Sequence, residues 1–148
     1  MEQNRKENLF VQMCRRHQKE FNEFPLVFAF SKEEALEKLG LTHEESDVVS
    51  CFSNTGSYFK KSDEPAFYAM LDRHQKERED AIQSDQSGNG FIFSMFSYVL
   101  ESQEFAYTYD IEDTLNFLGY TIEEVLNSKA LLNGLNKALK KYGVALKK

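Results

Sequence analysis

Asp85, Ser87 and Asn89 place oxygen-bearing side chains at alternate positions, and a glycine and an isoleucine follow them. This spacing matches the first eight positions of a calcium-binding EF-hand loop, which needs such a glycine for its sharp turn. The last ligand position should be a glutamate that gives calcium two oxygens, but it is Phe96. Because only one carboxylate remains, we expect a turn that starts a helix and not a calcium site.

Cysteine and histidine side chains would suit a second chemistry, zinc binding. Cys14 and His17 lie one helical turn apart, and Cys51 and His74 complete a set of four ligands. The set lacks the CxxC or HxxxH spacing typical of zinc sites, so we interpret both cysteines as reduced, mostly buried core thiols. We therefore expect no metal and no cofactor.

Neighbouring carboxylates occur at Asp63 and Glu64 and at Glu101 and Glu104. General acid–base catalysis requires such groups, but carboxylate pairs are also common at solvated helix ends. The chain contains no GxSxG, P-loop or dinucleotide-binding motif. We expect no catalytic residue, and an enzyme of an unrecognised class stays open as an alternative.

Charge is distributed unevenly along the 148 residues. Residues 1–20 carry five basic and three acidic side chains, and residues 137–148 carry five lysines and no acid. Because the formal net charge is −6, residues 21–136 hold a net charge of −13. Such an acidic segment repels phosphate, so we expect a protein partner with a basic surface and not nucleic acid.

Apolar spacing and capping residues predict the elements that position these side chains. Helices are expected at 4–22, 31–40, 62–83, 91–103, 110–119, from 121 onward and through 131–142. Aromatic-alternating strands are expected at 26–31 and 104–110, and a hairpin at 48–61. The pattern predicts a single domain of residues 1–148 with an α+β fold, in which helices pack on a small antiparallel sheet made of the hairpin and one or two aromatic-rich strands.

The sequence also carries information about the compartment. No apolar run approaches the ~20 residues needed to cross a bilayer, and the N-terminal residues lack the apolar core of a signal peptide. We expect a cytoplasmic protein with no membrane partner. A homo-oligomer is compatible with the sequence.

Two segments, 27–46 and 106–125, repeat one pattern at an offset of 79 residues. Each contains an aromatic pair, a capping residue, two spaced leucines, a glycine and a Thr-x-Glu-Glu run. The pattern indicates an internal strand–helix duplication. Independent convergence on common capping residues would explain it equally, and both interpretations stay open.

Each repeat also has the order of a helix-turn-helix, so a DNA-binding protein is an alternative. The recognition helix would begin with Glu44 and Glu45 in the first repeat and with Glu123 and Glu124 in the second. These carboxylates would face phosphates and base acceptors, which disfavours DNA binding. We interpret them as candidates for contact with a basic protein.

Four stretches carry a family resemblance: FxxFPxxFAFS at 21–31, KKSDEPAFYAMLDRHQKE at 60–77, SGNGFIFSMFSYVLESQEFAYTYDIEDTL at 87–115 and the LGYTIEE run. Together they resemble a family of small proteins of unknown function carried on bacterial plasmids, conjugative elements and phages. The resemblance covers nearly the whole chain and brings no activity or functional residue with it. It implies an accessory or anti-defence protein that acts by binding, so we expect a small, acidic, non-enzymatic protein-interaction module.

Overall fold

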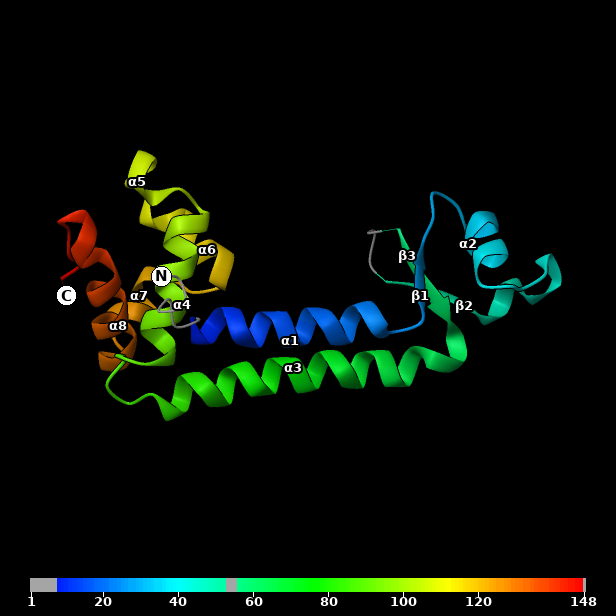
Figure 1. Cartoon of the computed structure of the whole chain (residues 1–148), viewed down its shortest axis with the longest axis horizontal. Helices are drawn as coiled ribbons and strands as arrows, with labels where there is room; N and C mark the ends of the chain where they lie inside the picture. Colours follow the sequence, from blue (N-terminus) through cyan, green and yellow to red (C-terminus); the bar gives the residue numbers. More distant parts are fainter. Residues whose placement is uncertain (1–7, 53–55, 148) are drawn as a thin grey trace, which may run out of the picture. The chain divides into compact units, whose positions relative to one another are not determined.

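The computed structural model describes residues 8–52 and 56–147, which form helices and one small sheet (Figure 1). The helices are α1 (Leu9–Glu23), α2 (Lys32–Lys38), α3 (Glu64–Ser84), α4 (Phe91–Ser102), α5 (Phe105–Thr108), α6 (Ile111–Leu118), α7 (Ile122–Leu126) and α8 (Lys129–Leu139). Short 3-10 turns are η2 (His43–Val48), η3 (Lys61–Asp63) and η4 (Lys140–Tyr142). The α+β class expected from the sequence is confirmed.

The sheet contains β1 (Leu26–Phe28), β2 (Val49–Phe52) and β3 (Ser57–Lys60) in the order β1-β3-β2. Both pairings are antiparallel, and Leu26 lies opposite Phe59. The predicted hairpin is confirmed in its strands, whereas its turn at 53–55 lies outside the described residues.

The chain divides into two compact units, residues 1–16 with 77–148, and residues 17–76. We call the first the helical unit and the second the sheet unit. The single-domain organisation expected from the sequence stays a prediction.

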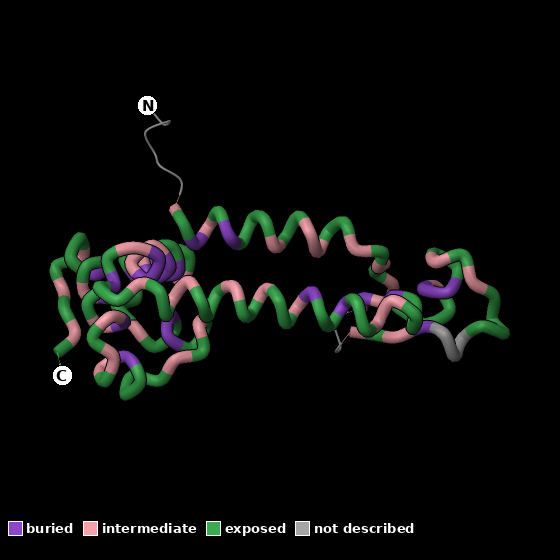
Figure 2. Tube along the Cα trace, turned by 90° about the horizontal axis from the view of Figure 1, so that it is seen from below, coloured by how far each residue is buried: buried purple, intermediate pink, exposed green. Residues whose placement is uncertain are grey.

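The core of the helical unit is built around α4, which is buried along a wide face. Its buried residues fall in neighbouring pairs four positions apart, as expected for a helix covered from more than one side. They are Phe91, Ile92, Met95, Phe96, Val99 and Leu100. α8 supplies the largest complementary set, including Leu135 and Leu139, and the buried positions of the unit appear in purple in Figure 2.

The core of the sheet unit is aromatic and centred on Phe67 of α3. The ring of Phe67 lies 4.6 Å from that of Phe59, 5.0 Å from that of Phe52 and 5.2 Å from that of Phe24, measured between centroids. Phe24 reaches this cluster because Pro25 terminates the first helix and turns the chain into β1.

The strand predicted at 104–110 is wrong, because this segment forms the single helical turn α5. Phe105 is buried in the helical unit, where its ring lies 5.0 Å from Tyr109 and 5.1 Å from Tyr142. All strands of the described residues belong to the sheet of the other unit, so the alternating aromatics have no strand to pair with. Burial of Phe105 overrides the local β preference.

No helix within residues 8–52 and 56–147 has both the length and the apolar character that crossing a bilayer requires.

Candidate functional site

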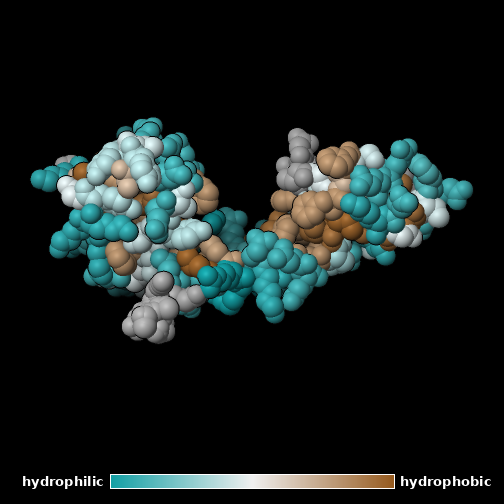
Figure 3. Space-filling view, turned by 45° about the horizontal axis from the view of Figure 1, so that its top comes forward, coloured by the Kyte–Doolittle hydropathy of each residue, from teal (hydrophilic) through white to brown (hydrophobic). Residues whose placement is uncertain are grey.

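Two neighbouring phenylalanines of the sheet unit are exposed. Phe28 ends β1 with 61% of its surface exposed, and Phe30, in the bend that follows, is 102% exposed. Burial of a phenylalanine side chain stabilises a fold by roughly 1.5–3 kcal/mol, and the fold does not gain this stabilisation in full at either position. Figure 3 shows hydrophobic side chains, in brown and tan, gathered on the surface of the sheet unit at the right. Grouped exposed apolar side chains mark interaction sites on soluble proteins.

The backbone beneath these rings is held by α2. The Lys38 ammonium donates a hydrogen bond to the carbonyl of Phe28 at 2.7 Å, and the N–H of Phe30 donates to Glu34 Oε1 at 2.9 Å. Glu34 and Lys38 also pair with each other at 3.2 Å. The Phe30 N–H, and after it Lys38, lowers the pKa of Glu34 below its usual range. The exposed rings therefore stand on an ordered backbone.

A cavity of about 290 Å³ opens beside this segment, lined by Phe28, Ala29, Phe30, Glu34, Lys38 and Gly56. Gly56 closes it from the hairpin, since its carbonyl accepts a hydrogen bond from the N–H of Ala29 at 2.9 Å. Gly56 has a left-handed φ of +82°, and a Cβ there would lie 3.2 Å from the Ala29 carbonyl oxygen. The cavity suits one large apolar side chain better than a whole small molecule.

A second, shallower hollow of about 550 Å³ follows α2 and the turn after it. It is lined by Ser31, Glu33, Glu34, Leu36, Glu37, Leu41, Thr42 and His43. Glu34 belongs to both hollows. We call the two hollows together the aromatic–acidic surface, because an apolar cavity here adjoins a row of carboxylates.

The two sequence repeats fold alike in their helices. Each helix begins at a capping side chain: Ser31 Oγ accepts from the N–H of Glu34 at 3.1 Å, and Asp110 Oδ1 accepts from the N–H of Glu112 at 3.0 Å. Such caps satisfy amide groups that the first helical turn leaves unpaired.

Both helices of the repeats also end in the same way. Gly40 and Gly119 have left-handed φ values of +74° and +83°. The residue after each glycine donates to the carbonyl of a buried leucine, Leu36 at 2.8 Å and Leu115 at 2.9 Å. This hydrogen bond and the left-handed glycine are the features of a Schellman-type helix end.

The four acidic candidates from the sequence lie in the turns that follow these glycines. Glu45 and Glu124 each accept a hydrogen bond from the backbone N–H of the threonine three residues earlier, at 2.9 and 2.8 Å. They are therefore helix caps, and the Thr42 N–H lowers the pKa of Glu45. Glu44 and Glu123 are exposed.

The aromatic pairs of the two repeats share exposure but not backbone conformation. Tyr107 and Tyr109 stand where the first repeat has Phe28 and Phe30, and they are 86% and 55% exposed. They belong to α5 and its left-handed end, where Tyr109 has a φ of +53°, and not to a strand. The structural correspondence between the two repeats thus extends over the helix and the turn and not over the strand, and duplication and convergence both stay open.

The helix-turn-helix alternative depends on a second helix that would enter the major groove. In the structure these second elements are η2, of six residues, and α7, of five residues. Neither is longer than two turns, and both carry glutamates in their first turn. This geometry disfavours recognition of DNA.

The sequence 85–92 forms a turn that starts α4. Both carboxylate oxygens of Asp85 accept backbone hydrogen bonds, Oδ1 from Gly88 at 3.1 Å and Oδ2 from Gly90 at 3.0 Å and Ile92 at 2.9 Å. The carboxylate that would bind calcium therefore organises the loop itself.

Ser87 has a similar local role in this loop. Ser87 Oγ accepts from the N–H of Asn89 at 3.0 Å, and both residues are exposed. Asn133 of α8 donates to the carbonyl of Ser87 at 3.4 Å. The Ser87 hydroxyl also donates to Asp85 Oδ1 at 3.4 Å, and the contact with Asn133 fixes the loop on α8.

The expectation of buried cysteines is wrong, because Cys14 and Cys51 are both exposed. Cys51 precedes Phe52 in β2, and alternation along the strand directs it away from the core that Phe52 joins. Partial desolvation raises the pKa of the Cys14 thiol, with a smaller opposing effect from Arg78. Within the described residues, no group of three or more histidine, cysteine, aspartate or glutamate side chains is placed to hold a metal ion.

The two histidines of the candidate zinc set lie together in the sheet unit. The rings of His17 and His74 stack with their centroids 3.9 Å apart and an interplanar angle of 10°. Stacked rings direct their nitrogens outward from the pair, which is not the arrangement of two ligands converging on one ion.

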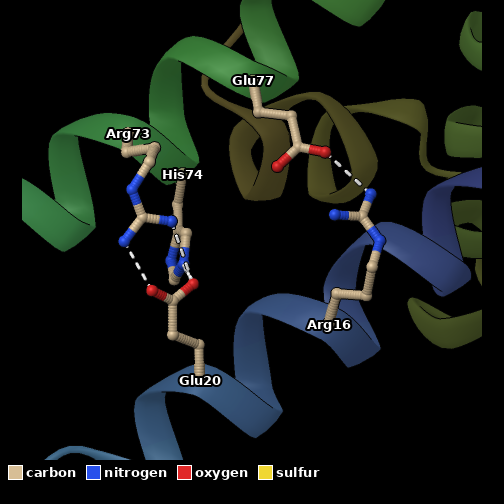
Figure 4. Close-up of polar contacts among 5 residues, drawn as sticks. All are labelled: Arg16, Glu20, Arg73, His74 and Glu77. Carbon is tan, nitrogen blue, oxygen red and sulfur yellow. Dashed lines mark hydrogen bonds and ion pairs between the residues drawn. The ribbon is translucent and has the colours of Figure 1, made fainter.

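Polar contacts join α1 to α3 within each unit (Figure 4). In the sheet unit Glu20 pairs with Arg73 at 2.5 and 3.0 Å and with His74 at 2.8 Å. Arg73 first, and His74 after it, lower the pKa of Glu20 to about 2. In the helical unit Arg16 pairs with Glu77 at 2.7 Å. Glu20 is therefore a fixed anion and a poor general base.

The carboxylate pairs considered for catalysis lie at helix ends. Asp63 belongs to η3 and Glu64 begins α3, whereas Glu101 lies in the last turn of α4 and Glu104 precedes α5. None of them lines the aromatic–acidic surface.

Sequence reasoning placed the exposed aromatics in strands and missed their exposure. In the first repeat the aromatic alternation runs over residues 26–30, which is two residues longer than β1. β1 ends at Phe28, opposite Ser57, so the last aromatic residue has no strand partner.

Comparison with known proteins identifies a family without adding an activity. No curated protein matches the chain, and no solved structure matches it. The model of one family, described as a family of unknown function (DUF7659), matches residues 9–141. The match covers most of the chain and extends over both units, and the chain therefore belongs to this family.

Proposed function

We propose that this chain is a non-enzymatic protein-interaction module that binds a basic segment of a partner protein through the aromatic–acidic surface. The observation that carries the proposal is the exposure of Phe28 and Phe30 on a hydrogen-bonded backbone beside a row of carboxylates. An acidic surface alone also serves to keep a small protein soluble, but solubility does not require exposed phenylalanines.

The charges around the surface favour a cationic partner. Residues 27–46 contain five carboxylates and two lysines. One of these lysines, Lys38, is already paired with Glu34 and the carbonyl of Phe28. Complementary charge accelerates association and rejects acidic partners, whereas affinity comes mainly from aromatic anchors and the side chains they cover. The matching segment therefore combines lysine or arginine with a large apolar residue.

The proposal includes a biological setting. The resemblance to proteins of plasmids, conjugative elements and phages supports a cytoplasmic accessory or anti-defence role, in which this chain binds a host protein instead of modifying it.

Fluorescence anisotropy tests the proposal with the full chain and a fluorescein-labelled peptide of arginine, lysine and leucine. We expect saturable binding at low salt that weakens as salt is added. A matched peptide with serine in place of leucine should bind at least about tenfold more weakly, because it lacks the anchor.

The matched variant is Phe28→Thr with Phe30→Ser, which keeps a β-branched residue in β1. It should weaken binding of the leucine peptide about tenfold or more while the circular dichroism spectrum stays unchanged. No binding by the original chain, or equal binding of the leucine and serine peptides, would refute the proposal.

A further inference from the structure

We infer that the chain carries a second docking surface of the same chemistry, formed by the second repeat in the helical unit, and that each chain binds two basic, apolar segments. This inference rests on the proposed function and deepens it by giving its valency.

The first support is the repeated architecture. The helices α2 and α6 share a capped start, a left-handed glycine end and a threonine–glutamate cap in the next turn. They also share their pattern of burial, with two adjacent buried residues, Ala35 and Leu36 in α2 and Thr114 and Leu115 in α6. Each helix therefore presents corresponding positions to solvent.

The second support is what those positions carry. Tyr107 and Tyr109 are exposed at the positions of the first aromatic pair. Phe117 replaces Lys38 and is 60% exposed, and Ile122 is exposed as well. Four exposed apolar or aromatic side chains thus lie in the second repeat, on α6 and on the segments that flank it.

Charge gives this surface the same preference for its ligand. Residues 106–125 contain five carboxylates and no lysine or arginine, so the second repeat is more acidic than the first. Two carboxylates, Asp110 and Glu124, are used as caps, whereas Glu112, Asp113 and Glu123 are exposed. A basic, apolar segment complements this surface as it complements the first.

Isothermal titration calorimetry of the full chain with the unlabelled arginine–lysine–leucine peptide measures the valency. We expect two peptides per chain. Tyr107→Ser with Tyr109→Asn removes the second aromatic pair, and asparagine tolerates the left-handed backbone at 109. That variant should bind one peptide per chain, as should Phe28→Thr with Phe30→Ser, and the combination of all four changes should bind none.

The outcomes separate the inference from the proposal beneath it. One peptide per chain, lost on Phe28→Thr with Phe30→Ser and unaffected by the tyrosine changes, would overturn the inference and leave the proposed function standing. Absence of any binding would remove both. Circular dichroism of every variant ensures that a lost site reflects a lost surface and not a lost fold.

Discussion

Two threonines of the second repeat differ in whether their hydroxyl groups have partners. Thr114 is fully buried in α6, and its hydroxyl has no hydrogen-bond partner among the described residues. Thr121 is exposed, and its Oγ1 accepts the N–H of Glu124 at 3.1 Å. Burial of an unpaired hydroxyl costs about 1–3 kcal/mol, whereas a threonine cap contributes about 1 kcal/mol.

The same substitution should therefore have opposite effects at these two sites. We expect Thr114→Val to raise the free energy of unfolding by about 1 kcal/mol, because it removes the unpaired hydroxyl and keeps the shape. Thr121→Val should lower it by about 1 kcal/mol through loss of the cap. Urea unfolding followed by circular dichroism measures both, and a loss of stability in Thr114→Val would contradict the assignment of its hydroxyl as unpaired.

Glu20 makes the stability of the folded chain depend on pH. Its pKa in the folded chain is about 2, lowered mainly by Arg73, compared with an ordinary value of 4.5. Because the folded pKa is the lower one, the contribution of Glu20 is complete above pH 4.5 and is lost as the pH falls toward 2.

We expect Glu20→Gln to reduce stability at pH 6 and to lose less stability than the original chain between pH 5 and pH 3. Glu23→Gln, which breaks an exposed pair with Lys19, is the matched control and should follow the original pH profile. Urea midpoints across this pH range provide the test. Parallel profiles for Glu20→Gln and the original chain would show that the Arg73 pair does not stabilise the fold.

At the scale of elements, the contact between α8 and the loop before α4 depends on two glycines. A Cβ on Gly134 would lie 2.4 Å from Cγ2 of Ile92 and 2.6 Å from the carbonyl oxygen of Gly88. A Cβ on Gly88 would lie 2.0 Å from the carbonyl oxygen of Ala130. Only glycine allows this approach, and so α8 can pack directly on the turn that Asp85 organises.

Gly134→Ala should destabilise the chain by about 2–3 kcal/mol, although alanine is the better helix former by about 1 kcal/mol. Gly119→Ala is the control, since its Cβ meets nothing within 4 Å and only the left-handed φ of +83° is strained. That control should cost about 1–2 kcal/mol. Chemical unfolding compares the two, and a smaller effect at Gly134 than at Gly119 would contradict the close packing.

Most of the helices and the hairpin were predictable because their signals are local. α1 ends at Glu23, two residues before Pro25. Ser31 and Asp110 cap the starts of α2 and α6. Gly40 and Gly119 follow the ends of these two helices with left-handed φ values. These residues act through backbone groups within four positions of themselves, so no knowledge of tertiary contacts is needed.

The errors occur where distant contacts decide the structure. The run 104–110 alternates like a strand, yet burial of Phe105 against Tyr142 makes it a helical turn. Cys14 lies on the apolar side of its helix in the sequence pattern, but the packed stripe of α1 is narrower and buries only Phe10 and Met13. Hydrophobic periodicity predicts which side of a helix or strand faces the core. It does not predict how much of that side a neighbouring element covers.

The candidate site was predictable in its charge and not in its aromatic part. The acidic run of α2 is visible in the sequence, but the exposure of Phe28 and Phe30 is not. Phe30 lies beyond the end of β1, and Phe28 is exposed although it is paired with Ser57. Glu45 and Glu124 were expected to contact a partner, and the structure shows that both also cap the turns of the repeats.

At the scale of the whole molecule, each compact unit contains one copy of the repeat: 27–46 lies in the sheet unit and 106–125 in the helical unit. The units have different cores, one built on aromatic rings around Phe67 and one on α4 and α8. The repeat therefore keeps its caps, its acidic residues and its exposed aromatics in two unrelated surroundings. A feature kept in both surroundings favours a shared role at the surface over a role in either core.

Recognition of a basic segment should also be selective among the acidic parts of the molecule. The run 79–85, at the end of α3 and in the loop after it, contains three carboxylates and no basic residue, but none of its residues lines the aromatic–acidic surface. If charge alone governed binding, this run would attract a cationic peptide as well. If aromatic anchors are required, it would not.

The most direct test is an amide NMR titration of the full ¹⁵N-labelled chain with the arginine–lysine–leucine peptide. The account predicts that chemical shift changes concentrate at residues 28–38 and 107–117 and largely disappear when serine replaces leucine in the peptide. Changes spread equally over all acidic segments, including residues 79–85, or equal changes with the serine peptide would contradict it.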